Sequence, residues 1–307
     1  MRRRTIAVFA ALSCVLVGLT ACGPGGSGRP SVVVTTNILG DITRNIVGDQ
    51  AEVTVLMEAN ADPHSFGVSA QQAARLEQAD LVVYNGLGLE ENVLRHVEAA
   101  GESGVATFAA GDAVDPIAYT SGDTAGKPDP HFWTDPDRMA KAVGLLADQV
   151  VKNVDGVDET TIRANADRYR TELQELTTWM EKSFARIPAG QRNLVTNHHV
   201  FGYLSQRFGF KVIGAVIPSG TTLASPSASD LRSLVTAIEQ AGVRAIFADS
   251  SQPDRLAQVL KRESKVEVKV VPLFSESLTE PDQGAATYLQ MMRANTTAIS
   301  DGLSVAP

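Results

Sequence analysis

The sequence has 307 residues, of which 44% are hydrophobic, and it carries a formal net charge of −8 at pH 7. A chain of this length can bury large cores without disulfide bonds, whereas its acidic balance argues against nucleic acid, which binds to basic patches. After the first 21 residues, no apolar run reaches the ~20 residues that a membrane-spanning helix needs.

Residues 1–21 have the pattern of a secretory signal peptide, because three arginines precede a short apolar stretch and small residues. Cys22 follows directly, as in the lipobox of bacterial lipoproteins, so we expect its thiol to be acylated. An ordinary signal peptide with an incidental cysteine is the alternative. The Gly- and Pro-rich residues 22–30 then form a flexible tether. These features predict an exported protein that is lipid-anchored on the outer face of the cell membrane.

Strand-like and helix-like patterns alternate over residues 31–157 and predict a first α/β lobe with a parallel sheet. We expect strands at 32–36, 51–57, 80–84 and 104–108, and helices at 38–48, 70–79, 89–99 and 138–151.

Residues 158–188 have apolar side chains at steps of three and four, which predicts a single long helix. Asp158 is the expected N-cap and Pro188 the expected stop. At ~1.5 Å per residue this helix would be roughly 40 to 45 Å long, enough to form a rigid connection between two lobes. The alternative is a long crossover helix inside one domain.

The alternation returns over residues 189–307 and predicts a second α/β lobe. We expect strands at 193–196, 211–216, 243–248 and 266–273, and helices at 200–207, 229–240, 253–262 and 285–299. The predicted fold class is therefore α/β, with two lobes of parallel sheet flanked by helices and joined by one long helix.

Three of the five histidines, His64, His131 and His198, lie in loop-like segments near strand ends. Proline directly precedes the first two and disfavours helix there. Imidazole is a good ligand for zinc and its neighbours in the transition series, and it argues against calcium or magnesium. Each histidine alone fits a surface or core position as well. His96 lies on a predicted helix among charged residues and is expected to face solvent.

Two motifs resemble a known family. Residues 129–136, Asp-Pro-His-Phe-Trp-Thr-Asp-Pro, and the pattern Thr-x-His-x-x-Phe-Gly-Tyr at 196–203 are similar to the zinc- and manganese-binding solute-binding proteins of ABC importers. The resemblance extends from about residue 31 to residue 300. It implies a metal site in the cleft between the lobes, and an importer permease and its ATPase as partners. We expect a monomer with no nucleic-acid partner.

The resemblance also implies the ligands of the transported metal. His64 and His131 would come from the first lobe and His198 from the second. The family usually has aspartate where this sequence has Glu276, and glutamate is one methylene longer. Glu276 can therefore reach the metal or leave a position for water, and a solvated loop carboxylate is the other interpretation.

Asp249, Asp135 and His199 are the alternative ligands or supporting residues. The Ser, Thr and Pro content of residues 274–283 further predicts a mobile loop around Glu276.

Three histidines and one carboxylate form a closed tetrahedral set for zinc. Manganese-selective relatives tend to replace the third histidine with a carboxylate, so His198 favours zinc, and manganese is the alternative. A zinc hydrolase is a competing function, but the sequence lacks a His-Glu-x-x-His helix. A surface adhesin or structural lipoprotein is a second competing function. We expect a binding protein and no enzyme activity.

Overall fold

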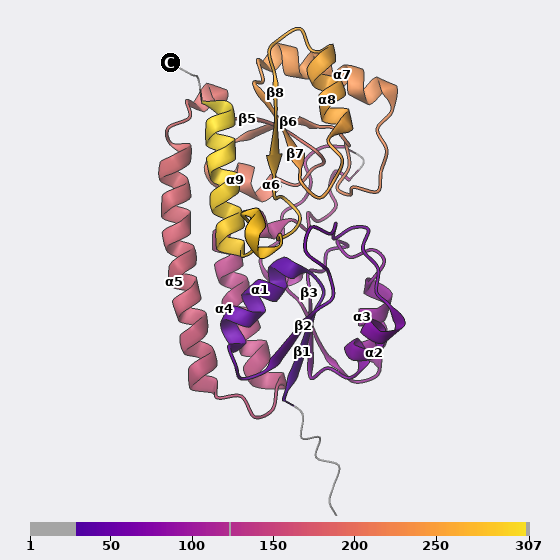
Figure 1. Ribbon diagram of the computed structural model, residues 1–307, viewed down its shortest axis with the longest axis vertical. Coiled ribbons are helices and arrows are strands. Elements are labelled where there is room, and N and C mark those ends of the chain that lie inside the picture. Colours follow the sequence, from indigo (N-terminus) through magenta and orange to yellow (C-terminus); the bar gives the residue numbers. More distant parts are fainter. Residues whose placement is uncertain (1–28, 123, 305–307) are drawn as a thin grey trace, which may run out of the picture.

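The computed structural model describes residues 29–122 and 124–304, which form two α/β lobes beside a long helix (Figure 1). The predicted signal peptide and Cys22 lie outside this range. Within it, no helix is long and apolar enough to cross a membrane.

The N-terminal lobe is built on a four-stranded parallel sheet with the order β2-β1-β3-β4. Alternate strand residues face opposite sides: Val32 and Val34 belong to the main core with α1 and α4, whereas Val33 joins a smaller core with α2 and α3. The elements are β1 (Ser31–Val34), α1 (Asn37–Val47), β2 (Glu52–Val55), α2 (Ala70–Glu77), β3 (Leu81–Tyr84), α3 (Leu94–Glu102), β4 (Ala106–Ala109), the 3₁₀ turns at Gly111–Ala113 and Phe132–Thr134, and α4 (Pro136–Asn153).

The C-terminal lobe repeats the plan, with a four-stranded parallel sheet of order β6-β5-β7-β8. Val195 and Ile246 face a separate core shared with α7 and α8, whereas Leu194 and Phe247 face the main core. The elements are a 3₁₀ turn at Ala189–Gln191, β5 (Asn193–Thr196), α6 (Gly202–Phe208), β6 (Lys211–Ala215), α7 (Ala228–Ala241), β7 (Ala245–Asp249), α8 (Arg255–Glu263), β8 (Lys269–Leu273), a 3₁₀ turn at Pro281–Gln283, and α9 (Tyr288–Leu303).

The long helix α5 (Glu159–Phe184) runs along both lobes and packs against α1, α4 and α9 (Figure 1). Asp158 is its N-cap and accepts a hydrogen bond of 2.7 Å from the Thr161 backbone N–H. Its buried stripe, from Ile162 to Phe184, belongs to a main core that also includes residues of both sheets. The predicted fold class is confirmed, and a continuous apolar core joins the two lobes around α5.

The two largest delays in a helix start, relative to the predictions, are in α3 and α9. Helix α3 begins at Leu94 instead of residue 89, because Leu87 and the glycines on either side adopt positive φ and form turns. Helix α9 begins at Tyr288 instead of residue 285, because the Thr287 hydroxyl caps it by accepting from the Gln290 backbone N–H.

Candidate metal centre

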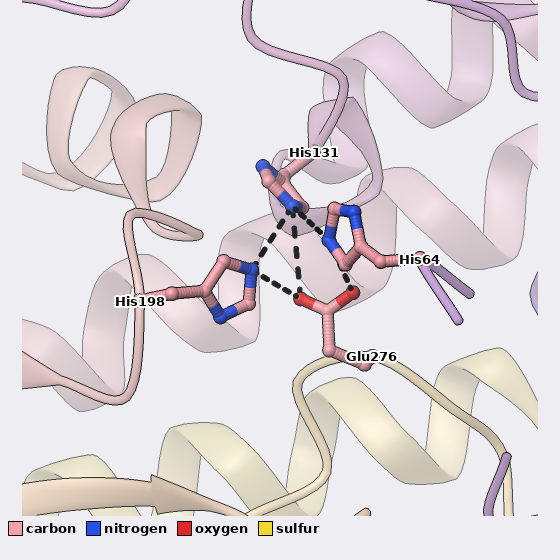
Figure 2. A group of neighbouring side chains, drawn as sticks. All are labelled: His64, His131, His198 and Glu276. Carbon is pink, nitrogen blue, oxygen red and sulfur yellow. Dashed lines mark hydrogen bonds and ion pairs between the residues drawn. The ribbon is translucent and has the colours of Figure 1, made fainter. Parts of the chain in front are cut away.

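Four side chains meet between the lobes, each just after a strand or in the loop that follows one: His64, His131, His198 and Glu276 (Figure 2). The carboxyl ends of parallel strands are where open α/β sheets bind ligands. Two residues come from each lobe, and none is more than 1% exposed. These four residues are called the metal centre below.

The spacing within the metal centre suits one small cation. His131 Nε2 lies 3.3 Å from both His64 Nε2 and His198 Nε2. Glu276 Oε1 lies 3.3 Å from His198 Nε2. A tetrahedral ion with ligand bonds of ~2.05 Å separates its ligand atoms by ~3.3 Å. One ligand atom from each of the four residues can be chosen so that all lie within 4.8 Å of one another.

Buried polar atoms of the metal centre lack hydrogen-bond partners within the described residues. They are both carboxylate oxygens of Glu276 and the Nδ1 atoms of His64 and His198. A buried carboxylate without donors is costly unless a cation compensates it. The two Glu276 oxygens face the imidazole nitrogens of the three histidines at 3.3 to 3.8 Å (Figure 2).

Burial also sets the protonation states of the metal centre. It lowers the pKa of His64 and His198 well below the ordinary value of 6.5, and the neighbouring imidazoles lower it further. Both rings are therefore neutral near pH 7, as a metal ligand must be. Burial raises the pKa of Glu276 well above its ordinary value, and nearby aspartates add to this effect. A bound divalent cation would reverse that preference and favour the carboxylate.

Two aspartates outside the predicted ligand set, Asp62 and Asp129, bind the backbone N–H groups of His64 and His131. His64 and His131 both belong to an Asp-Pro-His tripeptide. Asp62 Oδ1 accepts from His64 N at 3.0 Å, and Asp129 Oδ1 accepts from His131 N at 2.9 Å. The repeated tripeptide is the signal from which both aspartates could have been found.

Asp129 also orients the ring of His131. Its Oδ1 atom lies 2.7 Å from His131 Nδ1. Because a carboxylate only accepts, Nδ1 carries the proton and Nε2 keeps its lone pair for a metal. The Tyr203 hydroxyl donates to the Asp129 carbonyl at 2.6 Å, so α6 of the C-terminal lobe fixes this loop.

The loop that carries Glu276 differs from its prediction. Residues 275–279 are buried, although a mobile loop is expected from their composition. Asn37 of the N-terminal lobe donates to the Ser277 hydroxyl at 2.8 Å and accepts from Leu278 N at 2.9 Å. The Trp133 indole donates to the Ser275 carbonyl at 2.9 Å. Side chains of the other lobe therefore compensate for the polar composition and hold the loop in place.

The three alternative residues occupy other positions. Asp249 lies behind Glu276, where its carboxylate accepts from the Ser275 hydroxyl and from Ser251 N. Asp135 caps α4 by accepting from Asp137 N at 3.0 Å. His199 is half-buried, and its ring centroid lies 6.5 Å from that of Tyr119.

The chain matches one protein family and is similar to known metal-binding lipoproteins. The family model described as "Zinc-uptake complex component A periplasmic" matches residues 32–302. The chain is 28% identical over 311 residues to the metal ABC transporter substrate-binding lipoprotein FimA of Streptococcus parasanguinis, covering 98% of this chain and 99% of that protein. It is 29% identical over 308 residues to the manganese-binding lipoprotein MntA of Bacillus subtilis strain 168, covering 96% and 98%.

Solved structures with the same fold bind different metals according to their descriptions. The periplasmic zinc-binding protein TroA from Treponema pallidum superposes with a TM-score of 0.82 at 26% identity, covering 91% of this chain and all of that one. The manganese-bound periplasmic metal-binding protein from Candidatus Liberibacter asiaticus gives 0.79 at 27% identity, covering 90% and 100%.

Proposed function

The chain belongs to the zinc-uptake complex component A family, and on this premise we propose that it captures zinc through the metal centre. It is a binding protein outside the cytoplasm, not an enzyme, and it delivers a divalent transition metal to an ABC importer with its permease and ATPase. The choice of zinc and the assignment of the ligands form the proposal.

The observation that carries the choice of zinc is the set of three imidazoles with one carboxylate. Imidazole suits zinc, whereas carboxylate, carbonyl and water oxygens suit manganese. Four protein ligands also close a tetrahedral site, which fits capture, since a catalytic zinc keeps an open position for water.

Manganese is the second candidate, because relatives such as MntA are described as manganese-binding. The affinity of a given site generally rises from manganese to zinc along the transition series, so a higher affinity for zinc does not by itself decide between them. The informative quantity is the ratio of the two affinities and its change when an imidazole is replaced.

We therefore expect protein purified without added metal to contain one zinc per chain by elemental analysis and native mass spectrometry. His198→Asp should lower the ratio of zinc affinity to manganese affinity, because it replaces an imidazole with an oxygen ligand. His96→Asp, on α3, is the matched control and should leave the ratio unchanged. Manganese in place of zinc in the purified protein, or an unchanged ratio in His198→Asp, would contradict the choice of zinc.

We also propose that the protein is a monomer held at the membrane by lipid on Cys22. The support is the sequence around Cys22 and the relatives described as lipoproteins. Two or more acyl chains anchor a protein stably, at ~0.8 kcal/mol per buried CH₂. Cys22→Ala should move the protein from the membrane fraction to the soluble fraction, and unchanged fractionation would overturn the anchor.

A further inference from the structure

The loop between β6 and α7 (residues 216–227) crosses from the C-terminal lobe to the N-terminal lobe beside the metal centre. Its Thr222 hydroxyl donates to Asp62 Oδ2 at 2.6 Å, and Gln252 Nε2 from the next loop donates to the same oxygen at 2.9 Å. The other oxygen of this carboxylate holds the backbone N–H of His64. Asp62 is 7% exposed, so water competes little for these bonds. One carboxylate thus joins a histidine of one lobe to two loops of the other.

The same loop reaches the surroundings of the other two histidines. The Ser219 carbonyl accepts from the backbone N–H of His199, next to His198, at 3.0 Å. The Gly220 carbonyl accepts from the Tyr119 hydroxyl at 3.3 Å, and that hydroxyl lies 3.3 Å from His131 Nδ1. A Cβ atom at Gly220 would lie 2.4 Å from the Tyr119 oxygen, so only glycine allows this approach.

We propose that the β6–α7 loop is a clasp over the metal centre, and that Asp62 is the positioning residue through which it acts on His64. When Thr222 and Gln252 bind the carboxylate, Asp62 holds the His64 backbone in place. When the clasp opens, these donors leave and the backbone around His64 gains freedom. The inference rests on the proposed metal site, and it assigns control of metal release to the bonds of Asp62.

The packing of the C-terminal lobe favours a movement in which the β6–α7 loop leaves the metal centre while the Glu276 loop stays in place. The side chains of β6, α7 and α8 belong to a core separate from the main core around α5. The Glu276 loop is instead fastened to the N-terminal lobe by Asn37 and Trp133. The β6–α7 loop therefore joins elements outside the main core, so its own movement need not disturb the core around α5.

The test measures the rate of zinc release by rapid mixing of the zinc-loaded full chain with an excess of chelator. Asp62→Asn keeps an acceptor for His64 N but replaces the other acceptor with an amide donor. Thr222→Val removes the hydroxyl from the opposite side. Each variant should release zinc about tenfold faster than the wild type, as expected for the loss of a hydrogen bond to a charged group. The association rate should be unchanged.

A double variant shows whether Asp62 and Thr222 act on zinc release through their shared bond or weaken the protein independently. Because both changes remove the same charge-assisted bond, Asp62→Asn with Thr222→Val should release zinc no faster than the faster single variant. In the double variant Asp129→Asn with Thr222→Val, the two increases in release rate should instead multiply, since Asp129 acts on the ring of His131. Thr236→Val, on α7, is the matched control and should release zinc at the wild-type rate, because among the residues that the structure describes its hydroxyl bonds only within its own helix.

Hydrogen exchange gives a second measurement that does not depend on the kinetics. The backbone of residues 219–224 in the zinc-loaded protein should exchange faster in Asp62→Asn than in the wild type. Wild-type release rates in both single variants, with stoichiometric zinc, would overturn the clasp and leave the proposed function standing. A wild-type protein that binds no zinc would overturn the proposed function and the clasp together.

Discussion

The two Asp-Pro-His tripeptides, residues 62–64 and 129–131, share their sequence and their local backbone bond, yet their aspartates have different surroundings. Asp129 turns its Oδ1 to the ring of its own histidine at 2.7 Å. Asp62 turns its Oδ2 away, to Thr222 and Gln252 of the other lobe. Local sequence sets the bond from aspartate to the backbone two residues later, whereas the tertiary surroundings decide what else each carboxylate does.

Replacing the histidine of either tripeptide should weaken zinc binding more than any other change considered below. His131→Ala and His64→Ala should each weaken zinc binding by at least about a hundredfold, because each removes one of the four proposed ligands. His96→Ala, at the surface of α3, is the matched control and should bind as the wild type does. Zinc titration against a chelator of known affinity measures all three. A His64→Ala variant with unchanged affinity would remove the first tripeptide from the metal centre.

The next effect distinguishes the two aspartates. Asp129→Asn should weaken zinc binding by about 10- to 100-fold, because the ring of His131 loses the acceptor that fixes its tautomer. Asp62→Asn should weaken zinc binding less, and faster zinc release should account for the loss of affinity. Equal losses in the two variants, divided in the same way between association and release, would mean that the tripeptides have one role after all.

A smaller effect concerns protons. Burial favours the neutral form of both groups, because it lowers the pKa of His64 and raises that of Glu276. Wherever Glu276 is protonated, zinc binding should displace its proton, and affinity should rise with pH until the raised pKa of Glu276 is passed. Calorimetry in buffers of different ionisation enthalpy measures this release.

Glu276→Gln is the control for the proton count, because an amide has no proton to lose in this range. It should bind zinc more weakly and release fewer protons than the wild type in the pH range where Glu276 is protonated. Equal proton release by the two proteins at every pH would show that zinc displaces no proton from Glu276, against its raised pKa.

Much of the fold could be predicted because its signals are local. The apolar period of α5 and the β-branched run of β1 each lie in one stretch of sequence. The starts of α3 and α9 were wrong by a few residues, because turns with positive φ and a threonine cap determine them. Three histidines of the metal centre stood out through their proline-rich or aromatic surroundings, and the family resemblance added Glu276.

The parts that were missed depend on contacts between residues far apart in the chain. Asp62 and Thr222 are separated by 160 positions, and Asn37 and Ser277 by 240. No periodic pattern in the sequence predicts the contact of either pair. Composition alone predicted a mobile loop at 274–283, whereas residues 275–279 are buried and bonded to the other lobe, which the composition does not indicate.

Three imidazoles and one carboxylate are proposed to hold a single zinc ion between the lobes. X-ray absorption spectroscopy of the zinc-loaded protein can decide this, since it counts the ligands and measures their distances. We predict four ligands, with three imidazole nitrogens at about 2.0 to 2.1 Å and one carboxylate oxygen at about 2.0 to 2.2 Å. A spectrum with fewer than three imidazoles, or with a six-coordinate oxygen-rich shell, would contradict the assignment of the metal centre.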